Sequence, residues 1–430
     1  MGIHSFDFQI VKNALRFRLF FPLSQYVKNY ILSFNSAFIT KRLLLSPPKN
    51  TINKNTYLIF VQSNGSGHFT QMIQIIDILK PNYECIGIIA SYEKPNVTKY
   101  AQDNKLSLFN LEEPNYMNHD PNLEIVINGF REYLENYTKL YPDLSDFVDN
   151  HFPEFVINLH CPLIMHTFRN IPVFNISTQN RWNLNYCRQE LEELKLQYPN
   201  HPYMKAEMIN GILLSCYAMT NSYPIYHNIK IDTKKSLKNN IGVDYSLPPL
   251  INYQQLDQEI NQRRNNNIIL GYFHRCPLGI ECLETFMDIQ FHIFILFMEY
   301  EKPIKNVIWH KPSYEQFAKF RKQAFAFIGS CGCESVYEAY YLNIPSFCIP
   351  SNPEQLLNAI DHSSKIDSFF WDFKITVEGI QKLIDYIPTD QALYKHYKYT
   401  YFIRNGTKGL AKFIQTKIHL SDTNILSIFS

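Results

Sequence analysis

The sequence from residue 326 to residue 359 reads AFIGSCGCESVYEAYYLNIPSFCIPSNPEQLLNA, and the order of its features predicts the fold. An apolar run typical of a buried strand leads into a loop that contains Gly329 and Gly332. A segment with helical spacing follows at Ser335–Leu342, and a second apolar run begins at Ser346. Strand, helix and strand in this order form the unit of a parallel sheet that is covered by helices.

The same alternation continues from residue 55 to the end of the chain, so we expect an α/β fold with doubly wound parallel sheets. The expected strands of the first half are Tyr57–Val61, Cys85–Ala90, Phe155–Leu159, Val173–Ile176 and Ser215–Thr220. Those of the second half are Ile268–Phe273, Phe291–Phe297, Asn306–Trp309, Ala324–Ile328 and Ser346–Ile349. The expected helices of the second half are Tyr314–Lys322, Ser335–Leu342 and Glu354–Ile360.

A change of composition separates the two series of strands. Pro248 and Pro249 precede a polar stretch rich in Gln, Asn and Arg, which favours an interdomain linker. A tail with helical spacing at Asn405–Ile418 could pack back onto the first half. The expected organisation is an N-terminal extension at 1–54, a first Rossmann-like domain at 55–243, a linker at 244–267, a second Rossmann-like domain at 268–404, and a C-terminal helix and tail at 405–430.

Composition and charge narrow the class of protein. With 430 residues, 46% of them hydrophobic, the chain is long and apolar enough for sizeable cores. Its 41 basic and 39 acidic residues give a formal charge of +2, so no overall basic field favours a nucleic-acid partner. The nine cysteines lack paired Cys-x-x-Cys clusters, which argues against a disulfide framework or a structural zinc site and favours a reducing cytoplasm.

The first fifty residues differ from the rest of the chain. They hold seven Lys and Arg and one acid, Asp7, a net charge of +6, and they are also apolar. Charges and prolines interrupt every apolar run before it could span a bilayer, and a compact signal-peptide core is absent. Two interpretations stay open. The segment is either an extra helix packed on the globular body or an anchor that holds a cytoplasmic protein at the surface of an anionic membrane.

A first glycine loop follows the strand expected at Tyr57–Val61. It contains Gly65, Ser66, Gly67 and His68, and a helix follows. Its glycines would let a ligand approach the backbone closely, so amides at the helix start could point at an anion or a sugar hydroxyl. The loop lacks the third glycine of a dinucleotide fingerprint and the Lys of a phosphate loop. His68 is a candidate proton acceptor, and a histidine that only bonds locally is the alternative.

The second glycine loop presents groups suited to a phosphorylated sugar ligand. Gly332 and the Ser335 hydroxyl lie at a helix start that would favour an anion such as a diphosphate. Glu338 lies three residues later on nearly the same face, where its carboxylate could accept two hydroxyl groups, as a ribose would offer. Glu354 and Gln355 open the next helix, where they could bond a sugar. Separately, Glu338 could be a solvated helix residue and Glu354 an acid favoured by the helix dipole.

These motifs give the chain a family resemblance over about residues 55–420. It resembles GT-B glycosyltransferases, in particular the group that contains the bacterial N-acetylglucosaminyltransferase of peptidoglycan synthesis and related Gly-x-Gly-His proteins. Asn343 stands where that family has a glycine before Ile-Pro, and Asn also tolerates the left-handed conformation. His160 stands where relatives often have Asp. The matching donor positions are Gly332, Ser335, Glu338, Asn343–Pro345, Pro350, Glu354, Gln355, Asn358 and Ala359.

The resemblance implies an architecture and a set of residue roles. Two Rossmann-like doubly wound domains would face each other across a cleft. Gly332 and Ser335 would contact the donor diphosphate, and Glu338 would contact the ribose. Glu354 and Gln355 would contact the transferred sugar. The segment Asn306–His310 would lie beside the nucleobase, and His68 would lie near the acceptor.

We therefore expect transfer of a hexosyl or N-acetylhexosaminyl group from a nucleotide sugar, with UDP as the expected nucleotide, and with inversion at the anomeric carbon. His68 is the candidate base and His160 the reserve. His274 and Arg275 could help to stabilise the leaving diphosphate, unless they lie in an ordinary solvated loop. No Asp-x-Asp triplet occurs, so we expect neither a metal nor another cofactor.

Two other functions stay open for the same architecture. The first is a nucleotide-sugar 2-epimerase, and the second is a catalytically idle binding or scaffold protein. The acceptor is also open, since a lipid-linked saccharide, a glycan, a protein or a small molecule would each suit the sequence. A lipid-linked saccharide would match the basic apolar segment at residues 1–50.

Overall fold

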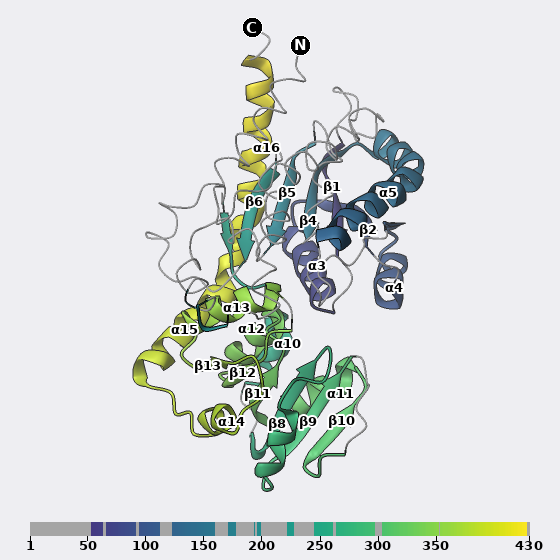
Figure 1. The fold of residues 1–430 in the computed structure, drawn as a ribbon. Coiled ribbons are helices and arrows are strands. Elements are labelled where there is room, and N and C mark those ends of the chain that lie inside the picture. Colours follow the sequence, from purple (N-terminus) through teal and green to yellow (C-terminus); the bar gives the residue numbers. More distant parts are fainter. Residues whose placement is uncertain are drawn as a thin grey trace. The chain divides into compact units, whose positions relative to one another are not determined.

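A computed structural model of the 430-residue chain divides into two compact units (Figure 1). The first unit comprises Met1–Leu250 and Gly406–Ser430, and the second comprises Ile251–Asn405. The structure describes residues 53–62, 66–91, 94–111, 123–159, 171–177, 193, 196–198, 222–227, 245–260, 264–296, 303–351 and 353–427.

The first unit is built on a parallel sheet of seven strands in the order β3-β2-β1-β4-β5-β6-β7. The first described strand, β1, lies inside this sheet, and the winding direction reverses between β1 and β4. The five residues from Tyr57 to Val61 are fully buried, as expected for a strand covered on both faces. The strands are β1 (Asn53–Val61), β2 (Glu84–Ala90), β3 (Ser107–Asn110), β4 (Pro153–Leu159), β5 (Val173–Ser177), β6 (Ser222–His227) and β7 (Tyr245–Leu247).

The core of the first unit combines residues from near the start and near the end of the described sequence. Helix α3 contributes Met72 and Leu79, and the C-terminal helix α16 contributes Leu410, Ile414 and Ile418 at four-residue spacing. The tail therefore packs against the first unit, because its apolar stripe completes that core (Figure 1). The described helices of this unit are α3 (Ser66–Leu79), α4 (Pro95–Asp103), α5 (Leu123–His151) and α16 (Leu410–Ser427), with the 3-10 helix η5 (Gly406–Gly409) before α16.

The second unit has a parallel sheet of six strands in the order β10-β9-β8-β11-β12-β13, and its winding reverses between β8 and β11. The strands are β8 (Asn265–Phe273), β9 (Gln290–Ile295), β10 (Val307–His310), β11 (Ala324–Gly329), β12 (Ser346–Cys348) and β13 (Phe369–Trp371). The helices are α10 (Tyr253–Asp257), η4 (Ile280–Thr285), α11 (Tyr314–Arg321), α12 (Cys333–Tyr341), α13 (Pro353–Ser363), α14 (Val377–Ile384) and α15 (Asp390–Asn405).

Two doubly wound parallel sheets with helices confirm the fold class expected from the sequence. The expected strand at Ser215–Thr220 lies outside the described residues. Four strands, β3, β6, β7 and β13, were not predicted. Runs of three or four residues such as β3, β7 and β13 carry little periodicity, and β6 contains Pro224, which weakens a strand pattern.

The stretch 244–267, expected to be a linker, contains β7, α10 and the start of β8. The boundary between the two units falls inside this stretch, between Leu250 and Ile251. Leu247 and Leu250 belong to the core of the first unit, while Leu256 is buried among residues of the second. Buried leucines thus attach the first part of this polar stretch to the first unit and the following part to the second unit.

The core position of α16 gives a first prediction. Replacing Ile414 by Ala removes a fully buried side chain and leaves a cavity, so the free energy of unfolding should fall by about 2–4 kcal/mol. Urea denaturation followed by circular dichroism would measure the change. Gln415 is exposed on the same helix, so Gln415→Ala serves as the control with little effect. Equal stability of the two variants would contradict this placement of α16.

Candidate functional site

The turn between β11 and α12 is held close to the neighbouring strand β8. A Cβ atom added to Gly329 would lie 2.7 Å from both the Phe327 ring and the Tyr272 carbonyl oxygen. The Ser330 amide donates to the same Tyr272 carbonyl over 3.0 Å. Gly329 is therefore required by the packing of the chain itself, because any side chain there would push β11 away from β8.

Gly332 differs from Gly329, because the packing of the described residues leaves room for a side chain there. It is the N-cap of α12 with φ −67° and ψ 132°, a conformation open to any residue. A Cβ atom at Gly332 would meet no atom within 4 Å. Space is thus kept in front of a helix start, where backbone amides and the helix dipole favour an anion. Glu334 adds a negative charge in the same first turn.

The loop around Gly332 is fixed from both sides. The buried Asn358 side chain of α13 donates to the Cys331 carbonyl over 3.1 Å, and the Ile349 amide donates to the Gly329 carbonyl over 2.8 Å. Asn343 adopts a positive φ of 55°, which confirms that it takes the left-handed conformation expected at this point. These contacts make the start of α12 a preformed part of the second unit.

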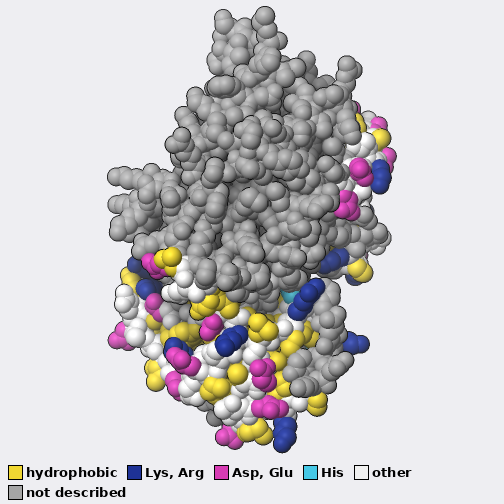
Figure 2. All heavy atoms as spheres, viewed as in Figure 1, with side chains coloured by type: hydrophobic (Ala, Val, Ile, Leu, Met, Phe, Trp, Pro, Cys, Tyr) yellow, Lys and Arg dark blue, Asp and Glu magenta, His cyan; other side chains and the backbone are white. Residues whose placement is uncertain are grey.

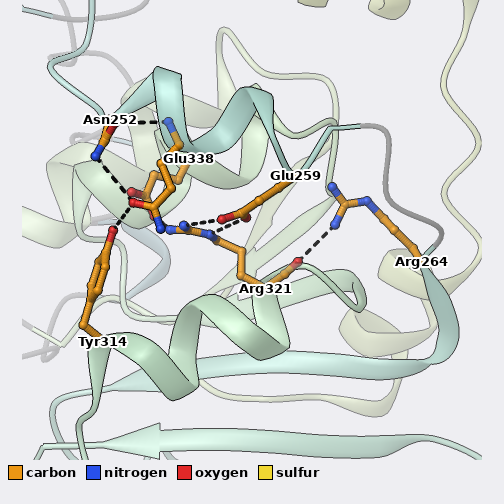
Figure 3. Close-up of polar contacts among 7 residues, drawn as sticks. Asn252, Glu259, Arg264, Tyr314, Arg321 and Glu338 are labelled. Atoms are coloured by element: carbon orange, nitrogen blue, oxygen red, sulfur yellow. Dashed lines mark hydrogen bonds and ion pairs between the residues drawn. The ribbon is translucent and has the colours of Figure 1, made fainter.

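Glu338 is buried in the second helical turn of α12, with only 9% of its surface exposed. Its Oε2 atom accepts a hydrogen bond from Arg321 Nη1 at 2.6 Å (Figure 3). Arg321 in turn donates from Nε and Nη2 to the two carboxylate oxygens of Glu259, over 3.0 and 2.9 Å. The alternative that Glu338 is a solvated helix residue is therefore wrong.

The charges in this cluster shift each other's ionisation. Burial raises the pKa of the Glu338 carboxyl, Arg321 opposes the shift, and the charge of Glu259 adds to it. Burial alone would lower the pKa of Arg321, but the two carboxylates outweigh it and raise that pKa. Arg321 therefore stays charged, while the ionisation of Glu338 depends on its neighbours.

Further polar groups surround the Glu338 cluster (Figure 3). The Tyr314 hydroxyl donates to Gln255 Oε1 over 2.5 Å. Arg264 donates to the carbonyl oxygens of Arg321, Ala324 and Leu342, where α11 and α12 end. Ser335, Glu338 and Arg321 also line one small hollow, together with Leu270, Phe317, Ala324, Ala326, Phe327, Ala339 and Ile344.

The structure places Gln355 in a local hydrogen-bond pattern at the start of α13. Its side chain is 5% exposed, and its Oε1 atom accepts from the Ser351 amide over 2.9 Å and from the Ser351 hydroxyl over 2.7 Å. Gln355 thus stabilises the turn after Pro350. The side chain of Glu354, in the same helical turn, lies outside the described residues.

His310 ends the edge strand β10 and belongs to an aromatic cluster. Its Nε2 atom is 2.9 Å from His292 Nδ1, and its ring stacks on Phe294 at a centroid distance of 4.6 Å. Burial lowers the pKa of both histidines, that of His292 to about 4. Both rings are therefore neutral near pH 7.

His274 and Arg275 lie in the loop after β8. His274 is half-buried with its ring edge-on to Tyr272, at a centroid distance of 6.0 Å, and Arg275 is exposed. Arg275 therefore matches the alternative of an ordinary solvated loop, whereas the half-buried His274 does not.

His68 lies in the first turn of α3 in the first unit, where Ser66 and Gly67 open the helix. Its Nδ1 atom is 2.6 Å from the Gln62 carbonyl oxygen, which can only accept, so Nδ1 carries the proton and Nε2 is the basic nitrogen. Burial lowers the pKa of His68 to about 4. Gly65 and His160, which directly follows β4, lie outside the described residues.

The structure brings the predicted residues Gly332, Ser335 and Glu338 together at the first turns of α12. Arg321 and Glu259 are not among the residues predicted from the sequence. The pattern predicts an ordinary helix around Arg321 and a polar linker around Glu259. A charged residue that is buried needs a partner, but the sequence gives no local signal that either of these is buried.

On the face in Figure 2, the basic and acidic side chains of the described residues are intermixed. None of the described helices has the length and apolar character needed to cross a bilayer.

Comparison with known proteins relates this geometry to one fold. No protein-family model matches the sequence, and no curated protein is significantly similar to it. Among solved structures, UGT2 of Phytolacca americana with UDP-2-fluoro-glucose and pterostilbene is 12% identical, with a TM-score of 0.60 over 85% of this chain and 99% of that chain. UGT71G1 of Medicago truncatula with UDP-glucose is 15% identical, with a TM-score of 0.61 over 86% and 98%.

A UDP-glucosyltransferase of Polygonum tinctorium that can glucosylate indoxyl is 14% identical, with a TM-score of 0.58 over 85% of this chain and 99% of that chain. At these identities the likeness shows the fold, which is the GT-B fold of glycosyltransferases. The finer resemblance to the peptidoglycan N-acetylglucosaminyltransferase stays a prediction.

The environment of His68 predicts its titration. Because burial disfavours the charged ring, the imidazole should titrate with a midpoint near pH 4 and stay neutral from pH 6 to pH 8. A ¹H–¹⁵N NMR titration would measure this, with His68→Gln used to assign the signal. A midpoint for His68 above pH 6 would contradict the described burial.

Proposed function

We propose that this protein is a glycosyltransferase that moves a hexosyl or N-acetylhexosaminyl group from a UDP-linked sugar to an acceptor hydroxyl. The observation that carries the proposal is the start of α12, where Gly332 keeps space open in front of helix amides although the protein does not need a glycine there. The GT-B fold, seen in proteins whose structures hold UDP and UDP-sugars, supports the same assignment.

In this proposal the donor diphosphate binds at the start of α12. The amides of the first turn and the Ser335 hydroxyl would donate to its oxygens, and the helix dipole would stabilise its charge. Glu338 would accept hydrogen bonds from two ribose hydroxyls. A carboxylate has about four acceptor sites, so the contact with Arg321 leaves acceptor capacity for a ligand.

The remaining donor contacts follow the resemblance. Glu354 and Gln355 would bind the transferred sugar. The β10 strand with His310 would lie beside the nucleobase. His274 and Arg275 would stabilise the leaving diphosphate.

The proposed chemistry is inverting and independent of a metal. His68 would remove the acceptor proton through Nε2 while Gln62 holds Nδ1, and His160 is the reserve base. A base with a pKa near 4 is unprotonated at neutral pH and so ready to accept a proton, although it is a weak base. The positive end of α12 and the neighbouring side chains would take the place of a metal at the diphosphate.

The acceptor we propose is a lipid-linked saccharide, glycan or protein on the cytoplasmic side of a membrane. Residues 1–50, basic and apolar, would hold the protein peripherally on anionic lipid. Flotation with liposomes, comparing the full chain with a variant that lacks residues 1–50, tests this part. Equal flotation of the two proteins would contradict the anchor.

The central experiment is a panel of nucleotide sugars. Thermal shift would report donor binding as saturable stabilisation, and release of UDP would report transfer or slow hydrolysis. An isomerised sugar formed from the donor alone would favour an epimerase instead. Absence of both stabilisation and turnover for every donor would favour a binding or scaffold protein.

Gly332 allows a sharp test of the donor site. In Gly332→Ala the new methyl group meets no protein atom, so stability should stay within about 0.5 kcal/mol, while UDP affinity should fall about tenfold or more. Isothermal titration calorimetry measures the affinity. Gly329→Ala is the contrasting variant, which should lose about 1–3 kcal/mol of stability because its methyl group strikes the Tyr272 carbonyl. Unchanged affinity in Gly332→Ala would remove the diphosphate from this helix start.

His68 allows a test of the chemistry. Replacing His68 by Ala should lower kcat by about 10²–10⁴-fold, the usual contribution of a general base, with UDP affinity changed less than about twofold. Steady-state turnover of the donor found in the panel gives kcat. His151→Ala, at the end of α5, is the control. Full turnover in His68→Ala would overturn the assignment of the base.

A further inference from the structure

A buried chain of three charged side chains reaches the proposed donor site from outside it. Glu259 follows α10, Arg321 ends α11, and Glu338 lies in α12 (Figure 3). Their exposed side-chain fractions are only 0%, 5% and 11%. Such a cluster is costly to bury, and apolar residues of similar volume often stabilise a fold equally well. The cluster therefore calls for a reason beyond stability.

The geometry of the cluster fixes the orientation of Glu338. Glu259 accepts two parallel hydrogen bonds from Nε and Nη2 of Arg321, which sets the plane of the guanidinium group. The remaining Nη1 then points at one oxygen of Glu338 over 2.6 Å. A glutamate side chain has three rotatable bonds, and this contact restricts its rotamers. Glu338, Ser335 and Arg321 line the same small hollow.

Charged and titratable groups from several neighbouring elements interact with Glu338. Arg321 and the Tyr314 hydroxyl come from α11, Glu259 lies beyond α10, and Tyr399 comes from α15. Arg264 lies near Glu259 and Arg321. Arg321 is thus the cation that directly contacts Glu338, and it is shared with Glu259.

We propose that Arg321 and Glu259 are positioning residues of the donor site. Arg321 holds the Glu338 carboxylate oriented to accept the two ribose hydroxyls, and Glu259 holds Arg321 in place. The inference rests on the proposed function and extends it to the segment after α10, which the sequence pattern assigns to a linker. Neither residue contacts the donor in this scheme. Both act through Glu338.

Two substitutions should move the ionisation of Glu338 in opposite directions. In Arg321→Met the carboxylate loses its cation, so its pKa rises. In Glu259→Gln the repulsion from the second carboxylate disappears and Arg321 serves Glu338 alone, so the pKa of Glu338 falls. A general loosening of the structure would not produce shifts of opposite sign.

The experiment is the pH dependence of UDP affinity from pH 5 to pH 9, measured by isothermal titration calorimetry. Affinity should fall as the pH drops through the pKa of Glu338, because a protonated carboxyl loses acceptor capacity. Relative to the wild type, the midpoint should lie at higher pH in Arg321→Met and at lower pH in Glu259→Gln. Each unit of displacement weakens or strengthens binding tenfold at pH values below both midpoints.

Lys365→Met is the matched control. Lys365 forms a comparably buried ion pair with Asp361, over 2.9 Å, in the same unit but without contact to Glu338. This variant should lose stability without moving the midpoint. Should Arg321→Met fail to fold, the downward shift in Glu259→Gln decides the question alone.

Two outcomes separate this inference from the proposed function. If the wild-type protein binds no UDP nucleotide, the proposed function fails and the inference falls with it. If the wild type binds UDP but the midpoints of both variants coincide with its own, the three residues only stabilise the fold, and the inference alone is overturned.

Discussion

The architecture of the second unit depends on the close approach of Gly329 to the Tyr272 carbonyl of the neighbouring strand. This contact brings the end of β11 against β8, at the point where the winding of the sheet reverses. The chain can then leave β11 through Ser330 and begin α12 at Gly332, with Asn358 holding the loop from the other side. In parallel sheets ligands bind beyond the carboxyl ends of strands at such reversals, because the diverging helices leave room there.

The sequence predicts the fold because its decisive features are local. Apolar runs covered on both faces, such as Tyr57–Val61, and helical spacing in 335–342 depend on neighbours a few residues away. The left-handed conformation of Asn343 was instead expected from the family resemblance, because a glycine stands at this position in the resembling family and Asn tolerates the same conformation. The shortest strands and the elements β7 and α10 within the expected linker escaped prediction, since a few buried leucines in polar surroundings give no periodic signal.

The candidate site was predictable only in part, for a different physical reason. Gly332, Ser335 and Glu338 belong to one turn and helix, so their spacing alone places them together. Arg321, the direct partner of Glu338, lies 17 residues before it in the sequence. Glu259, the partner of Arg321, lies a further 62 residues before Arg321. Such pairings arise when helices pack, and no local pattern indicates which charged residue becomes buried. His310 is similar, since its contact with His292 depends on the pairing of β10 with β9.

The first unit has one more property that follows from its chain path. Its core includes Leu410, Ile414 and Ile418, which are synthesised after the whole of the second unit, Ile251–Asn405. During translation the second unit can therefore complete its core first, although domains nearer the N-terminus generally fold earlier. The part of this core that α16 covers stays open until Leu410–Ser427 has been synthesised. A nascent chain arrested before residue 410 would expose that apolar surface.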